Sequence, residues 1–285
     1  MRNVRLAVVQ MSILILVVVM VVGCARAGEL RTERHSVELE GAESVSTDLS
    51  MNAGNMVVEG GAQNLMDATF VYNVPEWKPD VSYGGIGEQK ELTVNQPDVS
   101  GPTFGSARND WQILLSDNVP MELSASNSSG EGQFDLDNIS LKTFSVEASS
   151  GDIAANVGGE QALLEDLTVD SSSGDVRLDL SGEYSSPVGL EVDLSSGDLT
   201  MDLSGRSWED DLEGDVGLSS GTATITLPRD VGVYVEAETS SGDVNASGFR
   251  LDGDAYVNGA YGESDITLNL SVESSSGDVN LRLTE

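Results

Sequence analysis

A short step, two serines followed by glycine and then a polar residue, recurs seven times in the second half of the chain. The six intervals between the successive glycines are 21, 23, 23, 24, 21 and 35 residues. The last interval is one period plus an insertion, which we place within residues 249–263. Seven matches at nearly constant spacing predict a repeat architecture in which each unit stacks on its neighbour. The glycines are Gly130, Gly151, Gly174, Gly197, Gly221, Gly242 and Gly277.

Aliphatic and polar residues alternate on both sides of these glycines, as in Leu190–Leu194 before Gly197 and Leu199–Leu203 after it. Such strands have one apolar and one polar face, and two of them alone cannot bury the apolar face. The sequence therefore predicts an all-β fold, a β-helix-like β-solenoid with coils of 21–24 residues and Ser-Gly-Asp corners. A rolled β-sandwich of hairpins is the alternative. Room for two or three short strands in each coil favours the solenoid.

Glycine supplies a positive φ at a corner, and the flanking Ser and Asp side chains can bond backbone groups that the corner leaves unpaired. In a solenoid the corner acids would form a column with a spacing of about 4.8 Å. Two such charges in water repel by roughly 0.8 kcal/mol, which exposed groups tolerate without a ligand. Calcium would relieve the repulsion, so a cation ladder is the alternative to a plain corner. Its ligands would be Asp152, Asp175, Asp198, Asp243 and Asp278, with Glu131 before them and Thr222 as the exception.

The first 24 residues resemble a prokaryotic lipoprotein signal. Arg2 and Arg5 precede an apolar run from Ile13 to Val22, which is too short to span a bilayer permanently. The run ends in Val-Val-Gly-Cys, similar to a lipobox, and this resemblance implies lipidation of Cys24 and cleavage before it. Two or three acyl chains anchor a protein stably to a membrane. An uncleaved signal anchor is the alternative. Cys24 is the sole cysteine, so the chain forms no internal disulfide.

Acidic residues outnumber basic ones by 48 to 14, which gives a formal net charge of −34. Removal of residues 1–23 takes away two arginines and no acid, so the charge becomes −36. This charge repels nucleic acid and argues against it as a partner. A halophilic source, a cation-binding surface and plain solubility all remain open, and the even spread of the acids favours the first.

The chain divides into four predicted regions. Residues 1–23 form the signal peptide, and residues 24–35 the lipidated cysteine and a polar tether. Residues 36–110 form a looser β domain, and residues 111–285 the solenoid. The stretch 96–109 is rich in Pro, Gly, Ser and Asn and is expected to be a loop or boundary.

No reactive constellation stands out, and we expect no catalytic residues and no bound cofactor. The sole histidine, His35, falls in the predicted tether, and the chain contains neither a Cys/His cluster for zinc nor a phosphate-binding Gly-Lys-Thr loop. Acids are too abundant for any one pair to indicate a glycoside hydrolase. The larger aromatic residues are expected in the core, with an exposed sugar- or protein-binding patch as the alternative. They are Trp77, Trp111, Trp208, Tyr72 and Tyr83.

The repeats of the form Ser-Ser-Gly-Asp-Val-x-Leu-x-Leu resemble the bacterial and archaeal "putative adhesin" domain of β-helical repeats. Residues 36–115 are similar to the toast-rack domain that often precedes it, and residues 111–132 resemble the same group. The resemblance implies the solenoid fold over most of the mature chain. The family has no established catalytic residues, so no site residue is transferred, and a fold does not define a function.

These features together predict a non-enzymatic protein, exported and lipid-anchored to the outside of the cell envelope, that serves as an adhesin or interaction scaffold. Its partners would be the membrane, through Cys24, and an envelope protein or polysaccharide. Ala25 stands where an inner-membrane retention Asp would be, which favours the outer membrane if the host has one. A polysaccharide-active β-helix enzyme and an envelope-stress sensing component are the alternatives.

Overall fold

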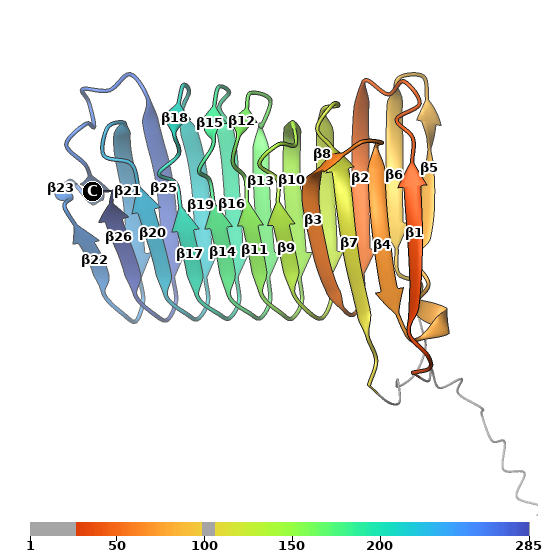
Figure 1. The fold of residues 1–285 in the computed structure, drawn as a ribbon. Coiled ribbons are helices and arrows are strands. Elements are labelled where there is room, and N and C mark those ends of the chain that lie inside the picture. Colours follow the sequence, from red (N-terminus) through yellow and green to blue (C-terminus); the bar gives the residue numbers. More distant parts are fainter. Residues whose placement is uncertain (1–26, 99–105, 285) are drawn as a thin grey trace, which may run out of the picture.

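A computed structural model describes residues 27–98 and 106–284 of the chain, which form one elongated stack of strands (Figure 1). Its described part contains 26 strands and one short 3-10 helix, η1 (Pro75–Trp77). No helix in these residues is long and apolar enough to cross a membrane. Two long sheets face each other, and a small third sheet closes one side. The predicted all-β solenoid is confirmed.

Sheet I has 11 strands. In spatial order they are β1 (Arg31–Val37), β4 (Met66–Tyr72), β7 (Asn109–Ser116), β3 (Asn55–Ala62), β9 (Gly132–Asp135), β11 (Ile153–Asn156), β14 (Val176–Asp179), β17 (Leu199–Asp202), β20 (Ala223–Leu227), β26 (Val279–Leu283) and β22 (Val244–Ser247).

Sheet II has 12 strands, and sheet III has three. The order in sheet II is β23 (Arg250–Asp252), β24 (Ala255–Val257), β21 (Gly232–Thr239), β25 (Thr267–Ser274), β19 (Leu212–Leu218), β16 (Val188–Leu194), β13 (Asp166–Ser171), β10 (Leu141–Ala148), β8 (Met121–Asn127), β2 (Ser44–Met51), β6 (Gln89–Asn95) and β5 (Asp80–Ile86). Sheet III consists of β12 (Glu160–Gln161), β15 (Glu183–Tyr184) and β18 (Ser207–Trp208).

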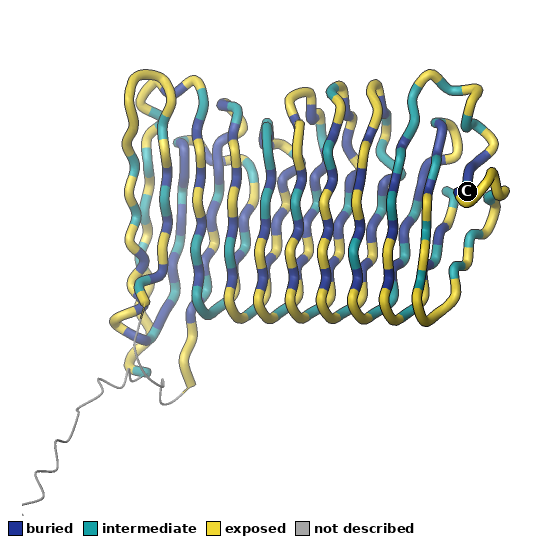
Figure 2. The backbone as a smooth tube through the Cα atoms, turned by 180° about the vertical axis from the view of Figure 1, so that it is seen from behind, coloured by how far each residue is buried: buried dark blue, intermediate teal, exposed yellow. Residues whose placement is uncertain are grey.

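Each central coil follows the same path. A strand of sheet II leads through a Ser-Ser-Gly corner into a strand of sheet I, and three of the coils add a two-residue strand of sheet III before the next coil begins. Neighbouring coils pair in parallel with equivalent residues in register, so Val146 pairs with Val169, and Val169 with Val192. All three of these side chains are buried. Figure 2 shows the resulting alternation of buried and exposed positions along every coil.

The coils at the C-terminal end do not stack in sequence order. The last coil, β25–β26, lies between the β19–β20 coil and the β21–β22 coil, because β26 pairs with both β20 and β22. The predicted insertion within 249–263 contains the antiparallel hairpin β23–β24 and the return path to β25. The expected column of corner residues is therefore corrected: Gly277 lies on Gly221, and Gly242 lies on Gly277.

The N-terminal end shows the same kind of permutation. The first coil, β2–β3, lies between the β6–β7 coil and the β8–β9 coil. Strands β5, β4 and β1 then extend the two sheets in antiparallel fashion. Both sheets run without a break across residue 110, so the two predicted β regions share one core.

The ordered fold begins inside the segment predicted to be a tether. Arg31–Val37 form β1, which pairs with β4 along seven residues. His35 thus belongs to an edge strand, where its ring lies 5.6 Å from the ring of Phe70. The sequence did not predict this strand, because most of its residues are polar and exposed and the strand contributes little to the core.

Candidate functional site

The Ser-Ser-Gly corners are defined by close backbone approach as much as by backbone conformation. All seven corner glycines have a positive φ, for example +118° at Gly174. A Cβ atom at Gly174 would lie 2.2 Å from the carbonyl oxygen of Gly151 in the preceding coil, well inside van der Waals contact. Glycine is required because each corner rests directly on the backbone of its neighbour.

The corner aspartates bond from coil to coil. The backbone N–H of Asp175 donates to Asp152 Oδ1 at 2.9 Å, and that of Asp198 donates to Asp175 Oδ1 at 2.9 Å. The same bond joins Asp243 N–H to Asp278 Oδ1 at 3.0 Å at the permuted end. Each carboxylate therefore satisfies an amide that the neighbouring corner leaves free, as a corner motif requires.

The structure contains no ready-made calcium ladder in the residues it describes, since no three or more His, Cys, Asp or Glu side chains are grouped to hold a metal ion. Thr222 N–H continues the chain of bonds by donating to Asp198 Oδ1 at 2.8 Å. Binding of Ca²⁺ by the predicted ladder stays a prediction.

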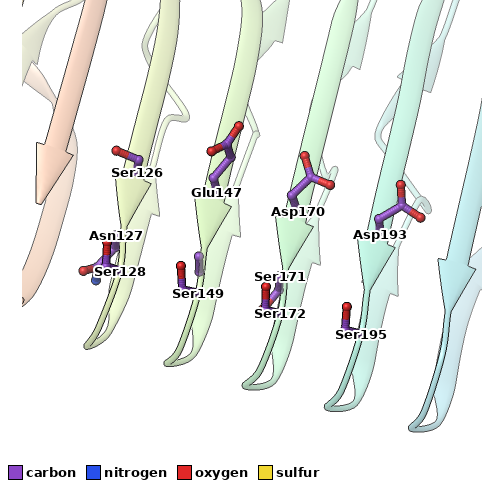
Figure 3. A pocket seen from close by; sticks show the side chains of 11 residues that line it. Ser126, Asn127, Ser128, Glu147, Ser149, Asp170, Ser171, Ser172, Asp193 and Ser195 are labelled. Carbon is purple, nitrogen blue, oxygen red and sulfur yellow. The ribbon is translucent and has the colours of Figure 1, made fainter. Parts of the chain in front are cut away.

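A shallow groove runs along the solenoid beside the corners, and we call it the corner groove (Figure 3). Its volume is about 320 Å³. A row of carboxylates lines it, contributed by Glu147, Asp170 and Asp193 near the ends of successive strands of sheet II. The first serine of each corner forms a second row, two residues further along the chain. These serines are Ser128, Ser149, Ser172 and Ser195.

The corner groove presents oxygen atoms at the spacing of the coils, about 4.8 Å. Among the residues that the structure describes, no Arg, Lys, His or aromatic side chain lines it. Carboxylates accept hydrogen bonds and serine hydroxyls both donate and accept, so a periodic, extended ligand with hydroxyl or ammonium groups matches its chemistry. Sequence reasoning missed the carboxylate row. Its signal was an acid four residues before the corner glycine, as at Glu147 and Gly151.

A second groove, of about 330 Å³, lies on the outer face of sheet I. Arg177 contributes to it and lies 3.6 Å from Asp179. Glu59 and Asp135 line the same groove beside the apolar Val57. The sequence had shown Arg177 only as one of several scattered arginines, and the parallel stacking of β3, β9, β11 and β14 brings it to these acids.

The aromatic residues belong to the interior, as expected. Trp111 and Tyr72 are buried in the main core, and Trp77 and Trp208 are also buried. Tyr83 is half-buried, and its hydroxyl donates to a backbone carbonyl. The alternative of an exposed aromatic patch formed by these residues is wrong.

A column of three side chains fills the inside of sheet III. Gln161, Tyr184 and Trp208 occupy equivalent positions, and the rings of Tyr184 and Trp208 stack with centroids 4.3 Å apart. The Tyr184 hydroxyl donates to the carbonyl of Val157, and Trp208 Nε1 donates to the carbonyl of Leu203 at 3.1 Å. Burial raises the pKa of Tyr184, so the phenol stays neutral and serves packing.

The N-terminal edge contains a small polar network. The Tyr72 hydroxyl donates to Glu33 Oε1 at 2.7 Å, and Lys78 Nζ lies 3.0 Å from Glu33 Oε2. These hydrogen bonds lower the pKa of Glu33, and the bond from the Tyr72 hydroxyl makes the largest contribution. Burial and the Glu33 carboxylate raise the pKa of Tyr72 to about 12. His35 lies 3.6 Å from Glu33 in the same network, which ties β1 to the fold.

Parallel coils that stack in register, each turning at a Ser-Ser-Gly corner, define a repetitive β-solenoid protein. The chain matches the N-terminal domain of toast-rack proteins (DUF2154) over residues 26–163 and the toast-rack family DUF4097 over residues 117–215. The two matches together span about two thirds of the chain. The chain therefore belongs to the toast-rack family, as the sequence resemblance predicted.

Several solved structures are similar to it. A "putative cell adhesion protein" from Clostridium sporogenes is 28% identical, covering 90% of this chain and 100% of that one, with a TM-score of 0.49. A "putative adhesin" from Parabacteroides distasonis is 13% identical over 91% of this chain and 99% of that one, with a TM-score of 0.35. A "putative adhesin" from Bacteroides fragilis is 9% identical over 90% and 99%, with a TM-score of 0.33. No curated protein matches the chain in sequence.

Proposed function

We propose that this protein is a non-enzymatic adhesin or interaction scaffold of the cell envelope, anchored outside the cytoplasm by lipid on Cys24. Cys24 lies outside the described residues, and the proposal for it rests on the lipobox-like sequence. The corner groove is the proposed binding surface. The observation that supports binding is its periodic lining of carboxylates and serine hydroxyls.

The proposed ligand is an extended polysaccharide or polypeptide of the envelope that carries ammonium or hydroxyl groups. Carboxylates hold ammonium groups through charge-assisted hydrogen bonds, and serine hydroxyls pair with sugar or backbone groups. Repetition along the coils permits many weak contacts at once, so the total affinity for a polymer exceeds that of any single contact.

The test is binding of the full chain to immobilised envelope polysaccharides and to peptidoglycan at fixed ionic strength. The triple variant Glu147→Gln, Asp170→Asn and Asp193→Asn removes the carboxylate row and is expected to weaken binding by about tenfold or more. The matched control, Glu122→Gln, Asp166→Asn and Glu191→Gln, removes the same charge from the same sheet outside the groove. Equal losses in the two variants, or no binding by the wild type, would contradict the proposal.

The anchor has a separate test. Mass spectrometry of the protein purified from membranes should find the mature N-terminus at Cys24 with acyl chains attached. Replacement of Cys24 by Ser should release the protein from the membrane fraction. An unmodified Cys24 in a chain that retains residues 1–23 would instead establish the uncleaved signal anchor.

A polysaccharide-active enzyme is the second candidate, and the groove on sheet I is the observation that favours it. Arg177 lies there with Asp179, Glu59 and Asp135, a mixture that binds acidic or neutral sugars. Hydrolysis or elimination products from envelope polysaccharides, lost in Arg177→Ala, would establish this function. Unchanged polysaccharide after prolonged incubation would remove it.

A further inference from the structure

The outward-facing side chains of sheet I form three rows that run along the solenoid axis, because its 11 strands pair in continuous register. The row at the level of the corners includes the corner aspartates. Among the described strands of sheet I, the middle row contains no acid, and we call it the acid-free lane. The third row is acidic again. Its acids are Asp67, Glu59, Asp135, Asp179 and Asp202.

The acid-free lane presents neutral hydrogen-bonding groups to the solvent. It begins at Arg34 on β1 and ends at Asn245 on β22, and each of its side chains is exposed or half-buried. Several of its amides and hydroxyls form no hydrogen bond with any other described residue, so they are free to donate to a ligand and to accept from it. These side chains belong to Thr69, Gln112, Gln133, Thr200 and Thr224.

Two grooves follow the acid-free lane from β1 to β14, and they meet at Glu59, which lines both. One is the groove of about 330 Å³ on the outer face of sheet I, and the other, of about 460 Å³, lies over β1, β4 and β7. Val57 and Ala154 provide apolar surface between the polar groups of the lane. Seven strands separated by about 4.8 Å extend over roughly 29 Å, so the shape suits an extended polymer better than a compact ligand.

The charges on either side of the acid-free lane select an uncharged ligand. Each acidic row lies two residues away, about 6.6 Å along a strand. An anionic polymer in the lane would meet carboxylates on both sides, and Arg177 already lies 3.6 Å from Asp179. A cationic polymer would be drawn to the acidic rows and would leave the amides of the lane unused. A polymer with hydroxyl groups alone finds donors and acceptors in the lane and further acceptors beside it.

The step along the acid-free lane favours a glycan over a polypeptide. Equivalent side chains recur about every 4.8 Å, which is close to the length of one sugar ring in an extended chain. An extended polypeptide advances about 3.3 Å per residue and would lose register with the lane within a few coils.

We propose that the acid-free lane of sheet I binds an extended, uncharged glycan that lies along the solenoid axis. Many weak contacts repeated along the coils add up to a useful affinity for a polymer. This face is separate from the corner groove, so the proposal does not depend on what the corner groove binds. It shares one groove with the polysaccharide-active enzyme considered above, but it requires no bond of the glycan to break.

Three polymers with the same β-1,4-linked backbone test the choice of ligand. Hydroxyethylcellulose is neutral, carboxymethylcellulose is anionic, and chitosan is cationic at mildly acidic pH. The full chain is expected to bind hydroxyethylcellulose with a Kd that changes less than about twofold between low and high salt, because no net charge attraction is involved. Carboxymethylcellulose should not bind, and chitosan should be released by salt. Failure of hydroxyethylcellulose to bind, or tighter binding of carboxymethylcellulose, would overturn the proposal.

Substitutions in the full chain test the place of binding. Gln112→Glu with Gln133→Glu puts two carboxylates into the acid-free lane and should weaken binding of hydroxyethylcellulose by about tenfold. The control, Gln63→Glu with Gln89→Glu, makes the same change at exposed positions outside the lane and should leave binding unchanged. Circular dichroism confirms that both variants are folded.

The triple variant of the corner groove separates this face from the proposed function. It should bind hydroxyethylcellulose as the wild type does, even where it has lost the ligand of the corner groove. Equal losses in the lane variant and its control, or a loss in the corner-groove variant alone, would overturn the proposal.

Discussion

The coils between β8 and β20 follow one another in space as they do in sequence, whereas the coils at both ends are permuted. In the middle, each corner glycine rests on the glycine of the preceding repeat, and short connections lead directly to the next coil. At the C-terminal end the chain leaves one place empty, builds β21–β24, and returns to fill that place with β25–β26. The first coil is likewise enclosed between two later ones.

This difference shows that the corner motif specifies a kind of contact and not a particular neighbour. Gly277 makes the same close approach to Gly221 that Gly174 makes to Gly151. Because all corners are equivalent, stacking order depends on connection lengths and on what covers the last coil. The permuted ends place antiparallel hairpins at both limits of the core, where repeat proteins need capping units.

The largest expected effect is at a central corner. Gly174→Ala combines a positive φ with a Cβ 2.2 Å from a carbonyl oxygen, so we expect it to cost more than about 4 kcal/mol or to prevent folding. Gly253→Ala at the C-terminal end is the control, because its φ is +66° and nothing lies within 4 Å of the added Cβ. That change should cost about 1–2 kcal/mol. Urea unfolding measures both, and similar costs would show that close coil stacking contributes little.

Truncation of a core side chain should lower the free energy of unfolding more in the middle of the stack than at its C-terminal end. Leu178→Ala removes a side chain from the centre of the stack and should cost about 2–5 kcal/mol. Leu283→Ala, at the half-buried last position of β26, should cost about 1 kcal/mol, since water reaches the site. The same unfolding measurement compares them. A larger loss from Leu283→Ala would make the permuted end the more tightly packed region.

The corner aspartates should contribute equally to stability in the middle of the stack and at the permuted C-terminal end. Asp175→Ala and Asp278→Ala each leave one backbone amide of the next coil without its acceptor and should each cost about 1 kcal/mol. Asp175→Asn keeps an acceptor oxygen and should cost less. Thermal unfolding distinguishes the three variants. A loss confined to Asp175→Ala would mean that the permuted coil is held by other contacts.

Acid should loosen the N-terminal edge before the middle. The pKa of Glu33 is lowered in the folded protein, so its contribution to stability is present above its unfolded pKa near 4.5 and is lost as the pH falls through the folded value. Glu33→Gln should therefore show a slightly lower melting temperature at pH 7 and little difference from wild type at low pH. Since Glu33 is partly exposed, the effect is small. A difference that is constant with pH would exclude the ionised Glu33 as its source.

Calcium is expected to have the smallest effect. The corner carboxylates already accept backbone hydrogen bonds, so melting temperatures in CaCl₂ and in NaCl of equal ionic strength should coincide. A higher melting temperature in calcium, lost in the variant Asp152→Asn with Asp175→Asn and Asp198→Asn, would establish the cation ladder that the sequence suggested.

Much of the fold could be read from local patterns. Alternation in segments such as Leu190–Leu194 predicted strands with one buried face, and the Ser-Ser-Gly steps predicted the corners. Strand β1 was missed because a charged edge strand has no apolar alternation. The carboxylate row of the corner groove was present in the sequence as an acid four residues before five of the seven corner glycines, but only the parallel register brings Glu147 beside Asp170.

The sequence by itself determined the strand faces, the corners and the need for stacking, because these follow from side-chain alternation and from glycine geometry within a few residues. The tertiary structure alone decided which coil lies beside which. Equivalent coils can pair with any neighbour at similar energy, so their order depends on chain closure over dozens of residues and on covering the exposed ends. That order also sets the unequal ends of the two long sheets.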